Sequence, residues 1–322
     1  MSQDFFHQPV MTKEVTDFLG LKKDGIYVDA TLGAGGHTEA LLRELQVTNY
    51  KLQIIAIDQD EEAINFAKKR LKKYGKNIIF IHDNFRNLNH IVTSHEHLHI
   101  SSVGADVGKI DGVLLDLGVS SYQFDEPSRG FSFRPLSQIP DQVRNDVSLD
   151  MRMDQRQSLS AYEVINNYSE ADLVKIFFEF GEERFSRQIA REIVKRRQEK
   201  KIKTASDLVA IIKSATPPGY RFSQRHHFAT KIFQALRIEV NQELEALKEF
   251  LPQAVECLKP GGRLVIISFH SLEDRIVKHF FREQKNQGTL NILTKKPLTP
   301  SSKEIQANPR SKSAKLRVVE KI

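Results

Sequence analysis

The first third of the chain alternates short apolar runs with segments of helical periodicity. Four short apolar runs are typical of buried strands and lie at Ile26–Ala30, Leu52–Asp58, Asn77–Ile81 and Ile110–Asp116. A crossover helix with one apolar face is predicted between the second and third runs by the spacing of Ala63, Ile64, Ala67 and Leu71. This alternation predicts an α/β fold with a doubly wound, mostly parallel sheet.

Helical signals replace the strand pattern in the middle of the chain. Three helix starts are indicated by serine or threonine followed three residues later by an acid, at Ser160, Ser169 and Thr204. A helix is then predicted at Thr230–Phe250, and the strand pattern resumes at Gly262–Ser268. We therefore expect a discontinuous sheet domain, residues 1–129 and 229–322, interrupted by an inserted helical domain, residues 130–228. The insertion leaves the sheet after the fourth strand, where ligands of such sheets bind, so we expect it to overhang the site.

The end of the chain completes the predicted sheet. Closing strands are predicted at Asn291–Thr294 and Lys315–Glu320, and the Pro-, Ser- and Lys-rich segment Lys296–Ser313 is interpreted as a loop. Pro260-Gly261-Gly262 is expected to end the helix before it and to start the fifth strand.

A glycine-rich turn follows the first strand and indicates a nucleoside-containing ligand. It contains Gly33, Gly35, Gly36 and His37, and small residues let the backbone approach a ligand closely. Such turns serve dinucleotides and S-adenosylmethionine alike. The methyl donor is favoured because Thr38 stands where a dehydrogenase fingerprint has its third glycine. Asp29, four residues before Gly33, also suits a methyltransferase.

Polar residues end the next two strands. Asp58 is placed to accept both ribose hydroxyls of a nucleoside, the alternative being an ordinary acid in a strand-end loop. Phe85 could lie against adenine, with Asp83 or Asn84 at the edge of the base. A phenylalanine after a strand is more commonly part of the core, so both interpretations stay open.

The fourth strand ends at Asp116, which we place opposite the donor methyl group. A carboxylate there can accept the N–H of an exocyclic amine and restore its nucleophilic character, or it can simply hold the cofactor; both roles remain open. The aromatic residues that follow could form a slot for an unstacked base or could pack between domains. They are Tyr122, Phe124, Phe131 and Phe133, with Arg129 and Arg134 beside the last two.

The segment Glu182–Lys203 is predicted to be a strongly basic helix. Arg187, Arg191 and Lys195 form a stripe at a spacing of four residues that can follow phosphates, although a solvated basic face is the commoner explanation. The formal net charge of +7 also suits a polyanionic partner without requiring one.

Several classes of site and location are not favoured by composition. The single cysteine, Cys257, can form no internal disulfide, and no metal site is expected at the scattered histidines 82, 90, 95, 97 and 99. The chain has no apolar run of about 18 residues, and Met1–Val10 lacks the features of a signal peptide, so we expect a cytoplasmic protein without membrane contact.

Many strings in this sequence resemble, in order, those of the bacterial 16S ribosomal RNA (cytosine-N4)-methyltransferases, the RsmH or MraW family. The strings that carry the resemblance are His7–Val10, Gly33–His37, Asp111–Ser121, Arg129–Phe133, Leu149–Asp154, Gly181–Phe185, Phe233–Ile238, Ser268–Arg275 and Asn308–Arg310. They extend over almost the whole chain.

The resemblance implies a class I, Rossmann-like methyltransferase sheet with an inserted, mostly helical substrate-recognition domain. It implies methyl transfer from S-adenosylmethionine to the N4 amine of a decoding-centre cytosine, with 16S ribosomal RNA in the 30S subunit as partner. The implied cofactor contacts are Gly35, Gly36, His37, Asp58, Phe85, Asp116 and Gln123. Arg237, Asn241, His270 and Ser271 are candidates for RNA contact, with structural roles as the alternative.

Two departures and several alternatives remain. The segment Arg134–Val147 is an extra stretch relative to the family, and Val147-Ser148 replaces its usual Gly-Pro, which affects the path near the expected cytosine pocket. An amine methyltransferase acting on DNA or a small molecule is one alternative function, and a non-catalytic RNA-binding assembly factor is another. The oligomeric state is open, with a homodimer as one option.

Overall fold

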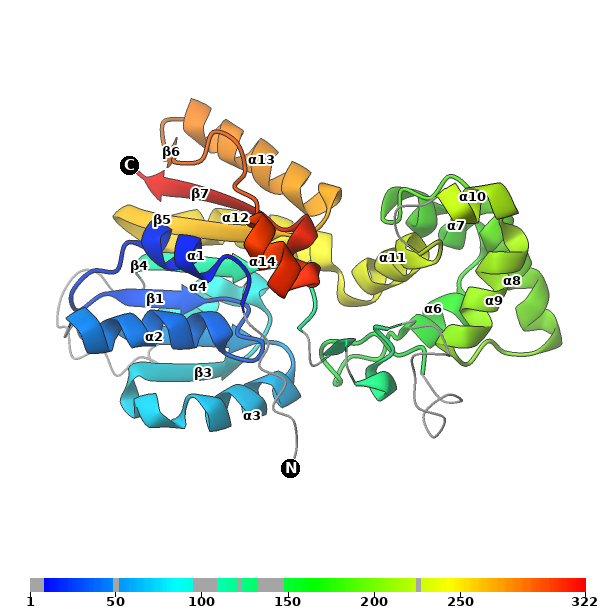
Figure 1. Ribbon diagram of the computed structural model, residues 1–322, viewed down its shortest axis with the longest axis horizontal. Helices are drawn as coiled ribbons and strands as arrows, with labels where there is room; N and C mark the ends of the chain where they lie inside the picture. Colours follow the sequence, from blue (N-terminus) through cyan, green and yellow to red (C-terminus); the bar gives the residue numbers. More distant parts are fainter. Residues whose placement is uncertain are drawn as a thin grey trace. The chain divides into compact units, whose positions relative to one another are not determined.

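The protein consists of two compact units (Figure 1). The computed structural model describes residues 9–48, 52–94, 109–120, 123–124, 126–132, 148–223 and 227–322. The sheet unit comprises Met1–Ser120 and Leu244–Ile322, and the helical unit comprises Ser121–Glu243. Helix α11 (Thr230–Asn241), which the sequence assigned to the sheet domain, contacts α6 (Ala161–Asn167) and α7 (Glu170–Glu179) and is part of the helical unit.

The sheet unit contains a seven-stranded sheet in the order β3-β2-β1-β4-β5-β7-β6. The strands are β1 (Ile26–Asp29), β2 (Gln53–Asp58), β3 (Ile78–His82), β4 (Ile110–Asp116), β5 (Leu258–Ser268), β6 (Leu290–Ile292) and β7 (Lys315–Lys321). β1 to β5 pair in parallel, whereas β7 runs antiparallel to β5 and β6. The predicted α/β, Rossmann-like sheet is therefore confirmed, because the order 3-2-1-4-5 is that of doubly wound nucleotide-binding folds.

Helices cover both faces of the sheet. Successive strand residues point to opposite faces, so Ile54 belongs to one core and Ile55 to the other. One core packs under α1 (Thr12–Leu19), α2 (Gly36–Thr48) and α3 (Glu61–Arg70), and the other under α4 (Leu88–Thr93), α12 (Glu243–Cys257) and α13 (Ser271–Asn286). In the part of the chain that the structure describes, no helix is long and apolar enough to cross a membrane.

Three boundaries predicted for the sheet domain are wrong. The helix predicted at Thr230–Phe250 is two helices, α11 and α12, because Gln242 takes a left-handed conformation with φ 50°. Strand β5 begins at Leu258, so Pro260-Gly261-Gly262 lies inside the strand, where the register with β4 shifts. The segment interpreted as a loop, Lys296–Ser313, contains α14 (Ser302–Ala307), capped by the Ser301 side chain, and a 3-10 turn at Pro309–Ser313.

The helical unit confirms the three predicted helix starts. Ser160, Ser169 and Thr204 each accept a backbone N–H three residues later, at the starts of α6, α7 and α9 (Ala205–Ala215). The basic helix α8 (Ser186–Glu199) is shorter than the predicted Glu182–Lys203. A short helix, α10 (Pro218–Ser223), begins inside the Pro-Pro-Gly segment that follows α9.

Candidate functional site

The glycine-rich turn after β1 packs closely against neighbouring side chains of the sheet unit. Gly33 and Gly35 have φ of 50° and 76°, which favours glycine. A Cβ at Gly35 would lie 2.9 Å from Cδ1 of Leu71, so the helix α2 can begin this close to α3 only without a side chain there. The turn therefore brings backbone N–H groups to the carboxyl edge of the sheet.

Asp29, at the end of β1, holds this turn from inside. Its side chain is 1% exposed, and it accepts hydrogen bonds from the Thr38 hydroxyl at 2.6 Å and from the Thr31 N–H at 3.3 Å. Burial raises the pKa of this carboxyl, which the bond from Thr38 partly opposes. These contacts connect the end of β1 to both Thr31 and Thr38 of the turn.

Asp58 joins the end of β2 to the same turn. Its Oδ2 accepts the N–H of Gly33 at 2.7 Å, and its Oδ1 accepts the N–H of Asp60 at 2.9 Å. Burial raises the pKa of the Asp58 carboxyl to about 7, despite these two hydrogen bonds, which favour the charged form. A carboxylate oxygen has a second lone pair, so each oxygen can still accept a ligand hydroxyl.

His37 and Asp116 face each other at the edge of the sheet. Nε2 of His37, in the first turn of α2, lies 3.3 Å from Oδ2 of Asp116, the last residue of β4. The backbone N–H of Asp116 donates to the Thr31 hydroxyl at 2.7 Å, which fixes the end of the strand.

Both side chains of this pair carry buried polar atoms without hydrogen bonds. Among the described residues, neither ring nitrogen of His37 nor Oδ1 of Asp116 has a hydrogen-bond partner. Buried polar atoms in folded proteins are nearly always satisfied, so these point to a polar ligand between the glycine turn and β4.

Phe85 follows β3 but packs into the core. Its ring is 9% exposed and meets Phe250 of α12 edge to face, with ring centroids 5.4 Å apart. Asn84, beside it, donates from its side chain to Gln59 at 2.7 Å. The contact with adenine stays a prediction, and the contacts of Phe85 favour the core alternative.

The remaining predicted cofactor and base contacts belong to the helical unit. Gln123 and Phe131 are 4% and 5% exposed. Tyr122, Phe133 and the extra stretch Arg134–Val147 lie outside the described residues. The polar side chain of Gln123 is therefore buried, and its contact with the cofactor stays a prediction.

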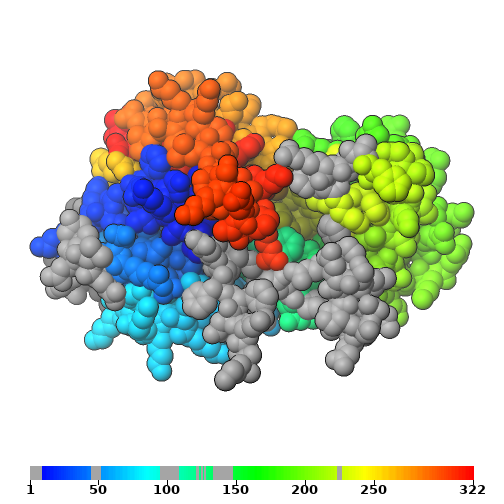
Figure 2. Space-filling view, in the orientation of Figure 1, coloured from blue at the N-terminus to red at the C-terminus, as the bar shows by residue number. Residues whose placement is uncertain are grey.

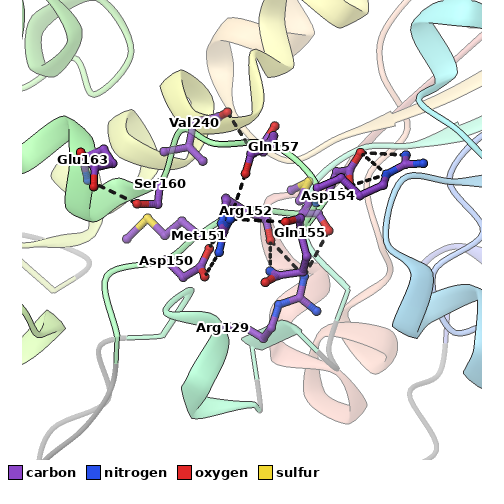
Figure 3. Close-up of polar contacts among 12 residues, drawn as sticks. Arg129, Asp150, Met151, Arg152, Asp154, Gln155, Gln157, Ser160, Glu163 and Val240 are labelled. Atoms are coloured by element: carbon purple, nitrogen blue, oxygen red, sulfur yellow. Dashed lines mark hydrogen bonds and ion pairs between the residues drawn. The ribbon is translucent and has the colours of Figure 1, made fainter.

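Arg129 and Gly130, which precede Phe131, are held by a segment that sequence reasoning did not connect to them (Figure 3). The buried Arg129 guanidinium donates to the carbonyls of Arg152 and Met153, at 3.0 and 3.2 Å. A Cβ at Gly130 would lie 2.3 Å from the carbonyl oxygen of Ser148. The string Leu149–Asp154 therefore supports Arg129 and Gly130, and the Arg-Gly pair was the signal of this contact in the sequence.

The stripe predicted on α8 is exposed. Arg187, Arg191 and Lys195 are all on the surface, and Arg191 has only a long contact of 3.9 Å with Glu170. Arg197 differs, because its guanidinium turns inward and donates to the carbonyls of Ile165 and Tyr168. The cations of the predicted stripe are therefore exposed, and their contact with a polyanion stays a prediction.

The four other candidates for RNA contact have internal partners or mixed exposure. Arg237 pairs with both carboxylate oxygens of Glu243 at 2.8 Å. Asn241 is 6% exposed and bonds to the backbone of Met151 and Met153. His270 caps α13, whereas Ser271 is exposed. For Arg237, Asn241 and His270 these contacts favour the structural alternative, and RNA contact stays a prediction.

The parallel sheet with one antiparallel strand, β7, between β5 and β6, together with the glycine turn and acids at three strand ends, defines a Rossmann-like methyltransferase. Comparison with known families is more specific. The chain belongs to the MraW methylase family, whose sequence model matches residues 4–322. The resemblance noted in the sequence is therefore confirmed.

Curated relatives extend over the whole chain. The "Ribosomal RNA small subunit methyltransferase H" of Carboxydothermus hydrogenoformans is 45% identical, covering 99% of each chain. The protein of the same name from Trichormus variabilis is 47% identical, covering 98% of this chain and 92% of its own. A solved rRNA methylase from Streptococcus thermophilus aligns with a TM-score of 0.42 at 15% identity, over 96% of this chain and 95% of its own.

Proposed function

We propose that the protein transfers a methyl group from S-adenosylmethionine to the N4 amine of a decoding-centre cytosine of 16S ribosomal RNA, in the small ribosomal subunit. The observation that carries the proposal is the facing pair His37 and Asp116 beside the glycine turn, because both ring nitrogens of His37 and Oδ1 of Asp116 have no hydrogen-bond partner among the residues that the structure describes. Membership of the MraW methylase family and the name of the relatives support the substrate class. The N4 position rests on the resemblance of the sequence motifs.

The residues of the sheet unit suit the two ends of the cofactor. Asp58 offers carboxylate oxygens to ribose hydroxyls, and the turn that contains Gly33, Gly35 and Gly36 lies beside it, because the Gly33 N–H donates to Asp58. The other end of the cofactor is an amino acid with one ammonium and one carboxylate group. The free Oδ1 of Asp116 suits the ammonium group, and a ring N–H of His37 suits the carboxylate group.

Asp116 is also the proposed catalytic residue. Bound S-adenosylmethionine supplies an electrophilic methyl group on a sulfonium. The lone pair of a cytosine N4 amine is delocalised into the ring, and a carboxylate that accepts its N–H makes that nitrogen a better nucleophile. In this role, which is the alternative to holding the ammonium group, Asp116 would accept the amine N–H through Oδ1, while the Thr31 hydroxyl fixes the backbone of Asp116.

The helical unit is the proposed RNA-recognition domain. Arg187, Arg191 and Lys195 on α8 would bind phosphates, and Phe131, with Phe133, would contact the base. Gln123 is proposed to contact the cofactor, while Arg237, Asn241, His270 and Ser271 are proposed at the rim of the RNA site. The support from the structure is greatest for the α8 stripe, because its cations are exposed.

Transfer of radiolabelled methyl groups tests the function directly. The full chain is incubated with labelled S-adenosylmethionine and 30S subunits that lack the modification, with free nucleosides and duplex DNA as parallel acceptors. The expected label is N4-methylcytidine after nuclease digestion of the 16S RNA. Label only in DNA or nucleosides would favour the alternative enzymes, and RNA binding without transfer would favour the assembly factor.

A further inference from the structure

The C-terminal segment, residues 271–322, has an excess of positive charge equal to the net charge of the whole chain. This segment has twelve lysine and arginine residues against five aspartate and glutamate residues, a difference of seven. The formal net charge of the whole chain is also +7, with 48 basic and 41 acidic residues. Residues 1–270 are therefore balanced, and the excess belongs to the C-terminal segment alone.

Two of the five acids in this segment are used at the start of α13. Glu273 is 1% exposed, and its Oε2 accepts the backbone N–H groups of Phe269 and His270 at 2.8 and 3.2 Å. Asp274 lies 2.7 Å from the guanidinium of Arg317 on β7. Neither carboxylate is placed to neutralise cations on the outer side of the helix.

Two more acids are used elsewhere in the sheet unit. Glu304 of α14 accepts the N–H of Met11 at 2.7 Å, and Glu320 pairs with Arg263 at 2.9 Å. Glu283 is left as the exposed acid of residues 271–322, all of which the structure describes. Four of the five acids of this segment therefore form contacts within the sheet unit, whereas most of its cations are exposed.

Nine of the twelve cations are exposed. Four lie at spacings of three or four residues along α13, over about 15 Å of helix: Arg275, Lys278, Arg282 and Lys285. The other five lie around α14 and the turn after it: Lys295, Lys296, Lys303, Arg310 and Lys312. Among described residues, Lys278, Arg282 and Lys285 have no ion-pair partner.

We call these nine residues the C-terminal cationic surface. The segments that carry them, coloured orange to red, form one continuous area in Figure 2. The donor-binding residues Gly33–His37, Asp58 and Asp116 belong to other segments of the sheet unit, so the surface is separate from them in the chain.

We propose that the C-terminal cationic surface binds the phosphodiester backbone of ribosomal RNA away from the methylated nucleotide. This inference rests on the proposed function, because it takes the substrate RNA as the partner. Lysine and arginine side chains bind phosphates irrespective of sequence, and such contacts set the position of a protein on a nucleic acid. The sheet unit would then hold the RNA directly, in addition to the stripe on α8.

The test is the salt dependence of RNA binding by two matched triple variants. The test variant carries Lys278→Gln, Arg282→Gln and Lys285→Gln. The control removes the same charge from exposed residues of the same unit and carries Lys69→Gln, Lys72→Gln and Lys76→Gln. The dissociation constant for 30S subunits is measured over a series of KCl concentrations.

We expect the test variant to bind more weakly and to reduce the slope of log K against log salt by about 2 to 3, since each lost phosphate contact removes about 0.7 to 0.9. The control variant should keep the wild-type slope. Equal slopes for both variants would overturn the proposal. So would a test variant that keeps its RNA slope but loses binding to vesicles containing phosphatidylserine, because the partner would then be a membrane.

Two parallel measurements distinguish a failure of this proposal from a failure of the proposed function. Calorimetric affinity for S-adenosylmethionine should match wild type in both variants, which shows that the sheet unit is folded. Methyl transfer by the wild type is measured on the same subunits. A wild type that binds RNA with the expected slopes but transfers no methyl group would refute the proposed function while supporting the surface.

Discussion

The imidazole of His37 faces the carboxylate of Asp116, with Nε2 and Oδ2 3.3 Å apart. One residue lies in the first turn of α2 and the other ends β4, so the pair exists only when both elements are in place. Both side chains have polar atoms without a hydrogen-bond partner among the described residues. Substitutions at this pair can therefore distinguish an effect on donor binding from an effect on catalysis.

Replacing the Asp116 carboxylate tests its catalytic role. Asp116→Asn keeps the shape but loses the negative charge that accepts the amine N–H, so single-turnover transfer at saturating donor and RNA should slow by roughly 100-fold or more. The exposed Asp17→Asn variant is the control and should keep the wild-type rate. A variant that regains the full rate once the donor is saturating would show that Asp116 only holds the cofactor.

Donor binding should depend on pH through Asp58. Burial raises the pKa of its carboxyl from 3.8 to about 7, and the ionised form is the better acceptor for ribose hydroxyls. We expect calorimetric affinity for S-adenosylmethionine to increase roughly tenfold as the pH rises from about 6 to 8. Asp58→Asn should bind more weakly, and its affinity should not change over this range.

The same pKa shift has the opposite sign for stability without the donor. A carboxyl whose pKa is raised on folding stabilises the folded state most below its unfolded pKa, and that contribution is lost as the pH rises through the folded value. The free energy of unfolding of wild type, relative to that of Asp58→Asn, should therefore decrease as the pH rises from about 4 to 7. Urea unfolding of wild type and Asp58→Asn across this range checks it, and parallel curves would contradict the raised pKa.

The stripe on α8 should contribute to RNA affinity through charge alone. Replacing Arg187, Arg191 and Lys195 by glutamine should weaken binding to 30S subunits and reduce the salt slope by about 2 to 3. Donor affinity should stay at the wild-type value, because these exposed residues of α8 are not among the proposed cofactor contacts. An unaltered slope would remove α8 from the interface.

Two glycines allow the effect of backbone conformation on stability to be measured separately from the effect of packing. Gly130 and Gly288 have φ of 74° and 76°, but a Cβ at Gly130 would lie 2.3 Å from the Ser148 carbonyl, whereas nothing lies within 4 Å at Gly288. Gly288→Ala should cost about 1–2 kcal/mol of unfolding free energy, the penalty of the left-handed conformation. Gly130→Ala should cost more than that, because the backbone must also move.

Urea unfolding followed by circular dichroism measures both glycine variants. Gly130→Ala should in addition expose the segment Leu149–Asp154 to limited proteolysis, since Gly130 and Arg129 pack against it. Equal losses of stability in the two variants would show that the contact with Ser148 is not tight.

The strands were predictable because each is an apolar run bounded by polar or small residues. β4 matches its predicted range, β1 and β2 differ from theirs by one residue at one end, and β3 is shifted by one residue at both ends. The break at Gln242 was not predictable, because neither glycine nor proline marks it and glutamine seldom takes a left-handed conformation. The helix α14 carried a signal, Ser301 three residues before Glu304, inside a segment whose composition suggested a loop.

The candidate site was predictable where it depends on strand ends. Asp29, Asp58 and Asp116 end β1, β2 and β4, and parallel strands bring their carboxyl ends to one edge. The facing of His37 and Asp116 was not predictable, because it depends on how α2 leaves the glycine turn. The burial of Asn241 and the pairing of Arg237 depend on tertiary contacts that no local pattern records.

The helical unit leaves the chain of the sheet unit after β4 and returns at α12, which leads directly into β5, the neighbour of β4. Nothing in the order of strands depends on what lies between these two points. An ancestral sheet could therefore acquire, lengthen or exchange this module without rethreading its strands, and acceptor choice can diverge among descendants while the methyl-donor chemistry is inherited unchanged.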